Sequence, residues 1–345
     1  MKVLVALSGG PQSFVTAWLL KKQGMQVRGV YFDIFADDLC NEKMLEAERK
    51  LGIPIQIMSA KELLKETLVR ERAECGLLGR RMNAKQVFHQ KILIPGLFQL
   101  AEQYKTEKVA SGHRVTLQDD PAAGVMRVFR GVESKVEDSL LVLGIPQEKL
   151  KNMMLPLGSI PESMLSKLIG EVALPEMTTV FEKDFDTIEN ELLSGGLDLG
   201  AAEYKVLTVE GVQIGHGPRN QFEPGASFLN PETPEKFYRV KEIYSATATV
   251  VVQEESNLRV QEIDFEEASW FQDEDLGLNL LETGLMLQGR DKALPIHLMQ
   301  FEGLRVKGKL LEPLMGREAD IFKGQSVLWV EGSEILGGAR VLRIK

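Results

Sequence analysis

The first half of the chain alternates short apolar runs with segments whose apolar residues recur at helical spacing. Residues 2–7 (KVLVAL) form a continuous apolar run that ends at Ser8-Gly9-Gly10, and residues 12–24 follow with helical spacing and a glycine stop. The same alternation continues through residues 26–34, 37–52, 53–59, 61–76, 86–104 and 107–113. This order predicts an α/β fold, a doubly wound parallel sheet with helices on both faces.

The pattern changes after about residue 180. Residues 201–217 contain two β-like runs around Glu210-Gly211, which is a hairpin signal, and residues 217–237 are rich in Pro, Gly and Asn and indicate a loop or linker. From Phe237 onward, short alternating runs predict a small sandwich or barrel. We therefore expect a nucleotide-binding domain at 1–182, a small β-rich central domain or linker at 183–235, and a C-terminal β-barrel at 236–345.

Charge and cysteine content narrow the function classes. The 345 residues carry a formal net charge of −9, which argues against a protein that coats nucleic acid by bulk charge, although a local basic groove is compatible with it. The two cysteines, Cys40 and Cys75, are too few for a disulfide scaffold or a four-cysteine metal site. No apolar stretch approaches the roughly 20 residues that span a bilayer, so we expect a cytoplasmic protein without a membrane partner.

The turn after the first apolar run has the chemistry of a phosphate site. Glycines let backbone N–H groups surround an anion, the following helix N-terminus attracts negative charge, and Ser13 opens that helix. The loop has neither the Gly-Lys-Ser/Thr of the Walker motif nor the spacing of the dinucleotide fingerprint. A Gly-Gly turn can also be a plain connection, and Pro11, Gln12 and Phe14 occupy the positions after it.

Six stretches, in order, resemble one known family. Ser8-Gly9-Gly10 with Ser13 is similar to the Ser-Gly-Gly-x-Asp-Ser loop of the PP-loop ATP pyrophosphatases, and the whole chain resembles the bacterial tRNA 2-thiouridylases. The matching stretches lie at 29–38, 80–93, 109–115, 127–150, 154–174 and 322–341. The resemblance implies an adenine nucleotide alpha hydrolase-like domain. The nucleotide-binding residues that it implies are Ser8, Gly9, Gly10, Gln12, Ser13, Phe32, Gly112 and His113.

In that family, ATP adenylates the wobble uridine of tRNA and a cysteine persulfide then delivers sulfur. The resemblance therefore implies ATP, Mg²⁺ and tRNA, and it implies tRNA contacts at Asn83, Lys85, Arg130, Arg290 and Gln325. This chain differs from the family at the positions of the residues that carry out the reaction. Phe88 occupies the first cysteine position, the stretch at 176–185 that should hold the second cysteine has none, and Gln12 replaces a loop Asp, so it cannot neutralise Mg²⁺.

Other departures concern the tRNA contacts and the thiols. Residues 136–138 read Val-Glu-Asp where the family has Lys-Asp-Gln, so a cation near the phosphate backbone is lost. Cys75, expected in a loop with Arg72, Arg80 and Arg81 nearby, is either a relocated nucleophile or an incidental buried thiol. Cys40, among acidic residues, is interpreted as incidental.

Histidines and basic residues give two further expectations. His113, at the end of a central strand, either points into the ligand crevice or only caps the strand, and His89 is expected on a helix facing solvent or the site rim. Lys85, Arg80, Arg81, Arg114, Arg127 and Arg130 are expected on loops, as a nucleic-acid footprint or as solvated surface.

Three hypotheses follow. The first is a 2-thiouridylase-like protein that has lost persulfide-based thiolation and retains the fold with nucleotide or tRNA binding. The second is an active ATP-dependent tRNA thiolation enzyme with an altered sulfur route, and the third is an ATP-dependent small-molecule ligase or thiolase on the same scaffold. We assign no metal ligands, and we expect neither a sulfur-relay protein nor DNA as a partner.

Overall fold

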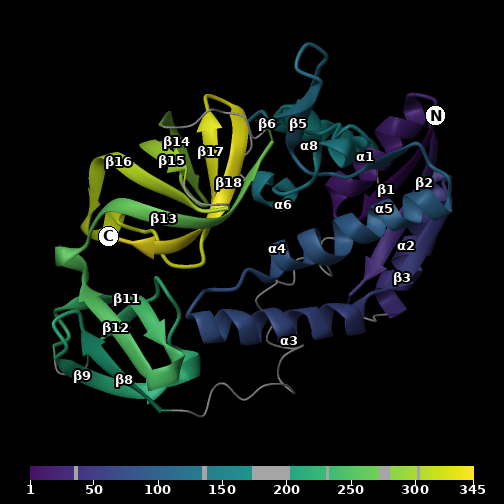
Figure 1. Cartoon of the computed structure of the whole chain (residues 1–345). Coiled ribbons are helices and arrows are strands. Elements are labelled where there is room, and N and C mark those ends of the chain that lie inside the picture. The colour runs from purple at the N-terminus through teal and green to yellow at the C-terminus, as the bar shows by residue number, and fades with distance from the viewer. Residues whose placement is uncertain (35–37, 134–137, 173–202, 231–232, 272–279, 301–303) are drawn as a thin grey trace. The chain divides into compact units, whose positions relative to one another are not determined.

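The computed structural model describes the chain except for residues 35–37, 134–137, 173–202, 231–232, 272–279 and 301–303. It divides into two compact units (Figure 1). The first unit consists of residues 1–68, 84–194 and 333–335, and the second of residues 69–83, 195–332 and 336–345. Neither unit is a continuous stretch of chain, because each contains a segment that lies within the sequence range of the other.

The first unit contains the predicted alternation of strands and helices. Its elements are β1 (Lys2–Leu7), α1 (Pro11–Lys22), β2 (Gln26–Asp33), α2 (Asp38–Leu51), β3 (Ile55–Ser59), the first part of α3 (Lys61–Leu78), α4 (Ala84–Phe88), the π-helical turn η1 (His89–Leu93), α5 (Ile94–Gln103), β4 (Lys108–Ala110), β5 (Val115–Asp120), β6 (Val125–Arg130), α6 (Ser139–Val142), α7 (Gln147–Leu150), β7 (Met153–Met154) and α8 (Glu162–Val172).

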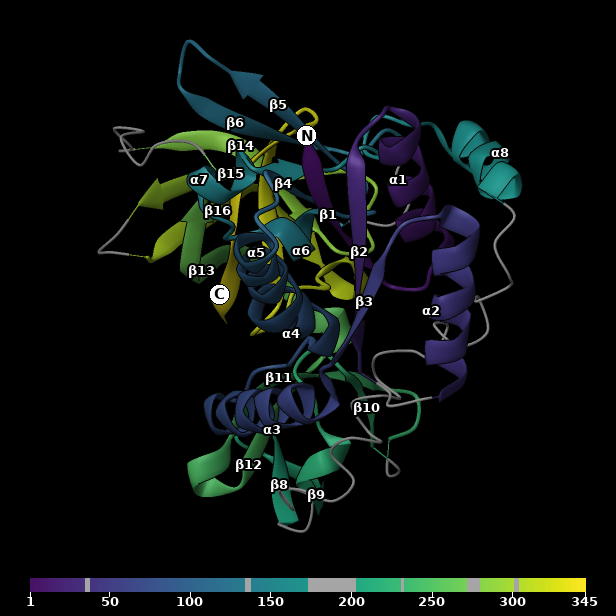
Figure 2. The same ribbon diagram turned by 90° about the vertical axis from the view of Figure 1, so that its right-hand side faces the viewer.

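Five strands form the parallel sheet, in the order β3-β2-β1-β4-β7. Strand β1 pairs with β2 from Lys2↔Gln26 to Leu7↔Tyr31 and with β4 on its other edge, all in parallel register. Helices α1 and α2 cover one face and α5 covers the other, as Figure 2 shows. The predicted doubly wound α/β fold is confirmed, and the carboxyl ends of β1 and β4 lie at the same edge of the sheet.

A hydrophobic core lies between the sheet and helices α1 and α2. Val3, Val5 and Leu7 project from alternate positions of β1 into this core, and side chains of both helices cover them. Phe14 from the first turn of α1 belongs to the same core and is 1% exposed. Burying a phenylalanine side chain contributes about 2–3 kcal/mol to folding, so this position stabilises the sheet.

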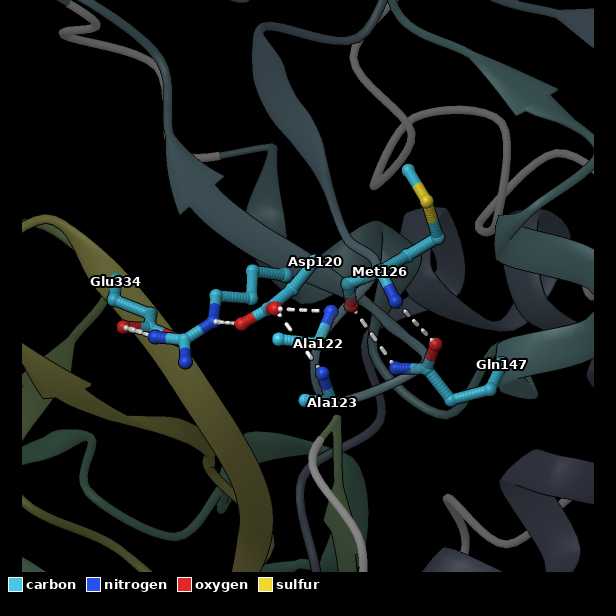
Figure 3. A network of polar contacts seen from close by, with 7 residues as sticks. Asp120, Ala122, Ala123, Met126, Gln147 and Glu334 are labelled. Atoms are coloured by element: carbon cyan, nitrogen blue, oxygen red, sulfur yellow. Dashed lines mark hydrogen bonds and ion pairs between the residues drawn. The ribbon is translucent and has the colours of Figure 1, made fainter.

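An antiparallel hairpin, β5–β6, extends the first unit. Asp120 caps its turn by accepting hydrogen bonds from the N–H groups of Ala122 and Ala123, both at 3.2 Å. Gln147 of α7 holds β6 through two bonds with the backbone of Met126, at 2.8 and 3.0 Å (Figure 3). Residues 334–335 pair with β6 as a further antiparallel strand. The hairpin is thus fixed from both sides.

The second unit contains a five-stranded sheet and a barrel. Its strands are β8 (Glu203–Thr208), β9 (Gln213–Pro218), β10 (Ser227–Leu229), β11 (Phe237–Tyr244), β12 (Thr249–Glu254), β13 (Arg259–Trp270), β14 (Leu281–Leu287), β15 (Leu294–Gln300), β16 (Val306–Met315), β17 (Ser326–Glu331) and the greater part of β18 (Glu334–Ile344).

The five-stranded sheet has the order β10-β11-β12-β8-β9. Strands β8 and β9 are antiparallel, which confirms the hairpin predicted around Glu210-Gly211. The expectation that residues 217–237 are only loop is wrong, because Ser227–Leu229 pair with β11 as β10. Strands β11 and β12, which the sequence groups with the last domain, pair in this sheet, and the boundary between residues 235 and 236 remains a prediction.

The remaining strands close into a six-stranded barrel, as predicted for the C-terminal region. Their order is β13-β16-β15-β14-β17-β18, and β13 pairs with β18 to complete the circle. The interior is filled by alternating apolar residues, with Trp329 fully buried and Phe265 edge-on to it at 5.9 Å between ring centroids. None of the helices in the described ranges is long and apolar enough to cross a membrane.

Candidate functional site

The loop between β1 and α1 is closed by two serines. The Ser13 hydroxyl donates to the carbonyl of Gly10 at 2.7 Å and accepts from the N–H of Ser8 at 3.2 Å. The N–H of Gly10 donates to the Ser8 hydroxyl at 3.3 Å, and Gly9 has φ of +80°, a backbone conformation that favours glycine. The loop leads into a 12-residue helix whose first N–H groups and positive dipole end suit an anion.

The unusual loop residues do not distort this arrangement. Pro11 occupies the first helical turn, where a proline is tolerated because that position has no intrahelical hydrogen bond to donate. The carbonyl of Gln12 accepts from the Thr16 hydroxyl at 2.9 Å. Phe14 points into the core described above and so leaves the loop unobstructed. The loop therefore keeps the closed strand-to-helix turn on which the predicted phosphate site depends, and Gln12 contributes a neutral amide to it.

Gly112 brings the end of β4 against this loop. A Cβ atom at Gly112 would lie 3.0 Å from the N of Ser13 and 3.1 Å from the carbonyl carbon of Gln12, so only glycine fits without displacing the backbone. Three of the residues predicted for the nucleotide site, Ser13, Gln12 and Gly112, thus lie together, and their contact with a nucleotide remains a prediction. Phe32 lies on β2, half-buried, and a Cβ atom at Gly96 of α5 would lie 2.9 Å from its ring.

Two imidazoles lie next to each other beside Gly112. His113 accepts or donates one hydrogen bond with the Ser111 hydroxyl through Nδ1, at 2.7 Å, and its ring is edge-on to His89 with centroids 5.1 Å apart. Burial, with the positive charge of Lys85 adding to it, lowers the pKa of His113 to about 4. Burial also lowers the pKa of His89 to about 3, reinforced by His113. Both imidazoles are therefore neutral at neutral pH.

Arg114 connects the segments around this site. Its side chain is 4% exposed, forms an ion pair with Glu162, and donates to the carbonyls of Val132 at 2.8 Å and Ile160 at 3.3 Å. The Arg114 N–H donates to the carboxylate of Asp138 at 2.9 Å. Arg114 thus holds two loops against the strand end that carries His113, and it is buried instead of forming part of a basic surface.

The site contains no thiol in the described part of the chain. Phe88, the last residue of α4, is 7% exposed. The expectation that Cys75 lies in a loop is wrong, because α3 continues to Leu78; its burial there agrees with the alternative of an incidental buried thiol. Burial raises the pKa of the Cys75 thiol, and Arg340 and Arg80 only partly oppose this effect. The side chain of Cys40 and residues 176–185 lie outside the described residues.

The predicted tRNA contacts are divided between the two units. Lys85 (on α4) and Arg130 (on β6) belong to the first unit, and Asn83, Arg290 and Gln325 to the second. Within the second unit, Arg290 donates to the carbonyl of Glu318, and Gln325 accepts from the N–H of Phe322 at 3.3 Å. Their contact with RNA remains a prediction.

The expectation that the basic residues all lie on loops is wrong. Lys85 is helical, and Arg127 and Arg130 lie on a strand. Several of the cations also have carboxylate partners: Arg80 pairs with Glu266, Arg81 with Glu223, and Arg127 with Asp120 and Glu334 (Figure 3). Such pairing reduces the positive field that these residues present to a phosphate backbone.

Sequence reasoning named His89 and His113 but overlooked Ser111 and the contact between the two imidazoles. Ser111 directly precedes Gly112-His113, so its position at the same strand end could have identified it as a site residue. The contact between His89 and His113 joins segments that are separated by an intervening helix, and no local pattern indicates it. Among the described residues, no group of three or more His, Cys, Asp or Glu side chains could hold a metal ion.

Comparisons with known proteins place these features in a family. A family model described as the tRNA methyl transferase HUP domain matches residues 1–184. The tRNA-specific 2-thiouridylase of Picosynechococcus is 24% identical, covering 98% of this chain and 97% of its own length. The corresponding protein of Clostridioides difficile is 26% identical over 50% of this chain and 51% of its own length.

Solved structures resemble parts of the chain. A 4-thiouridine synthetase–RNA complex with bound ATP is 16% identical, covers 56% of this chain and 53% of its own, and has a TM-score of 0.36. A predicted subunit of tRNA methyltransferase from Methanocaldococcus jannaschii is 21% identical over 56% of this chain and 87% of its own, with a TM-score of 0.34. Because the family model matches more than half of the chain, this chain belongs to the tRNA methyl transferase HUP-domain family, as a divergent relative of the tRNA-specific 2-thiouridylases.

Proposed function

We propose that this chain is a 2-thiouridylase-like protein of the cytoplasm that binds an adenine nucleotide and tRNA but does not transfer sulfur from a cysteine persulfide. The observation that carries the proposal is the contrast between an intact phosphate loop and the missing thiol. The hydrogen bonds of Ser13 keep the loop closed and shaped for an anion. Phe88 occupies the cysteine position, and burial raises the pKa of the Cys75 thiol.

The residues of the first unit suggest how a nucleotide would be held. The loop from Ser8 to Ser13 would receive the phosphates, with Gly112 behind it and Phe32 at the end of the neighbouring strand. ATP, when bound, would supply a group that activates an oxygen as a leaving group. Mg²⁺ fits less well, because the Gln12 amide is neutral and Mg²⁺ usually takes one or two carboxylates together with the phosphates. Binding of Mg-ATP is therefore expected to be weaker than with an aspartate at this position.

The names of the relatives support tRNA as the partner. Two 2-thiouridylases match nearly the whole length of this chain, so the regions that bear the predicted tRNA contacts are all present. Losing the nucleophile abolishes attack on an activated carbon without affecting the surfaces that bind nucleotide or RNA. Binding without sulfur transfer is thus the function that the residues favour.

Thermal unfolding with nucleotides tests the first half of the proposal. At 100 times the dissociation constant, a ligand that binds only the native state stabilises it by about 2.7 kcal/mol. We expect Mg-ATP to raise the melting temperature of the wild-type protein and of a Cys75→Ser variant equally. A Gly112→Val variant, whose side chain would enter the loop, should lose the shift. No shift for the wild type at millimolar Mg-ATP would contradict nucleotide binding.

Complementation tests the second half. A strain without 2-thiouridine that expresses this chain should remain without it, while tRNA should bind in gel-shift assays with an affinity that falls steeply with salt. Restored 2-thiouridine would overturn the proposal in favour of an active enzyme. In that case, loss of the restored activity in Cys75→Ser would identify Cys75 as the nucleophile.

A further inference from the structure

The inference concerns His89, the first residue of the π-helical turn η1. The N–H of Ile94 donates to the carbonyl of His89, which is the i→i+5 bond that defines a π-turn. Such turns inside α-helical segments occur frequently at functional sites, because the extra residue changes the direction of neighbouring side chains. Here the turn lies between α4 and α5, directly after Phe88.

The hydrogen bond of His89 fixes its tautomer. Nδ1 lies 2.7 Å from the carbonyl oxygen of Lys85. A carbonyl oxygen only accepts hydrogen bonds, so Nδ1 carries the proton. Burial and the nearby His113 and Lys85 lower the pKa of His89, and Asp138 only partly opposes them, so the ring is neutral. In a neutral imidazole with a protonated Nδ1, Nε2 is a hydrogen-bond acceptor and cannot donate.

The acceptor remains available beside the phosphate loop. In the described part of the chain, no residue forms a hydrogen bond to Nε2 of His89, and the ring is partly exposed. His113 stands edge-on to it, and Gly112, the neighbour of His113, lies against Ser13. All of these residues belong to the first unit. A ligand whose phosphate occupies the loop would therefore lie at the same strand end as this pair of imidazoles.

We propose that Nε2 of His89 accepts a hydrogen bond from an N–H or O–H donor of a bound nucleoside. The donor is a base imide or amino group, or a ribose hydroxyl. It belongs either to the nucleotide in the loop or to an unpaired nucleoside of the RNA. A fixed acceptor selects between ligands, because a group that presents a lone pair in the same place would leave two acceptors facing each other. This inference rests on the proposed binding of nucleotide and tRNA.

Two variants separate the acceptor from the shape of the ring. His89→Met fills a similar volume with only a weakly accepting thioether sulfur, and His89→Gln keeps an oxygen near the position of Nε2. Binding of Mg-ATP and of tRNA is measured for both variants by titration, with thermal unfolding to confirm folding. We expect one ligand to bind roughly tenfold more weakly to His89→Met and to recover in His89→Gln, since one hydrogen bond to a neutral acceptor contributes about that much. The ligand that responds identifies the source of the donor.

Nitrogen-15 NMR of the wild-type protein tests the tautomer without any variant. Nδ1 of His89 should resonate as a protonated nitrogen and Nε2 as an unprotonated one, unchanged between pH 5 and 8. A protonated Nε2, or equal binding of both ligands by wild type and His89→Met, would overturn this inference alone. A wild-type protein that binds neither ligand would overturn the proposed function, and this inference with it.

Discussion

Replacing Arg114 with methionine tests whether this residue holds the loops of the candidate site together. Its guanidinium donates to the carbonyls of Val132 and Ile160, and both would lose a charged donor. Both hydrogen bonds are part-buried, and a hydrogen bond to a charged group contributes about 1.5–3 kcal/mol. Removing a buried guanidinium offsets part of this loss, because its desolvation penalty disappears. We expect Arg114→Met to lower the free energy of unfolding of the first unit by about 3 kcal/mol.

The matched control is Glu162→Gln. The Glu162 side chain is 59% exposed, and the amide oxygen of glutamine still accepts from the guanidinium. An exposed ion pair contributes only about 0–1 kcal/mol, so this variant should lose at most about 1 kcal/mol. The assay is a urea titration read by hydrogen exchange of peptides from β1 and β4. If Glu162→Gln costs as much as Arg114→Met, the ion pair and not the carbonyl contacts stabilises the site, and the reasoning is refuted.

Three other predictions use the same unfolding and labelling assays. Gly158→Ala should cost more than about 2 kcal/mol, because its Cβ would lie 2.1 Å from a backbone oxygen, whereas Gly170→Ala, with open space in α8, should gain about 0.5–1 kcal/mol. The Cys75 thiol should resist alkylation at pH 7 in the folded protein, and rapid labelling would contradict its burial. The pKa values of His89 and His113 are about 3 and about 4 in the folded protein, whereas both imidazoles take up a proton below about pH 6.5 in the unfolded chain. The free energy of unfolding should therefore fall as the pH decreases below 6.5, by up to about 1.4 kcal/mol per pH unit for each histidine. A slope that His89→Gln leaves unchanged would exclude this residue as a source.

The sequence predicted the elements with strong local signals. The apolar run of β1, the Ser-Gly-Gly turn and the amphipathic segments determine strand, loop and helix within a few residues, and the structure has them there. The hairpin at Glu210-Gly211 has an equally local signal. Cys75 was misplaced because Gly76 and Gly79 suggested an early break, whereas α3 continues to Leu78 and tertiary packing outweighs the low helix propensity of one glycine.

The site needed information from distant segments. Whether Phe14 obstructs the loop depends on the direction of the α1 face that packs on β1, and the composition of the loop does not reveal it. The neutral state of His89 depends on His113 and on burial. Arg114 was interpreted as a surface cation, because no sequence pattern indicates that its side chain donates to the carbonyls of Val132 and Ile160.

The pairing of β6 with residues 334–335 has a consequence for folding kinetics. Arg127 and Glu334, which form an ion pair there, are 207 residues apart in the chain. Closing a loop of this length costs on the order of 5 kcal/mol of chain entropy, and the strand pairing compensates for it only once it has formed. During synthesis the hairpin edge therefore emerges long before its partner strand, and an unpaired strand edge is prone to aggregation. We expect the completion of the first unit to be a late, slow step that waits for nearly the last residues of this sequence.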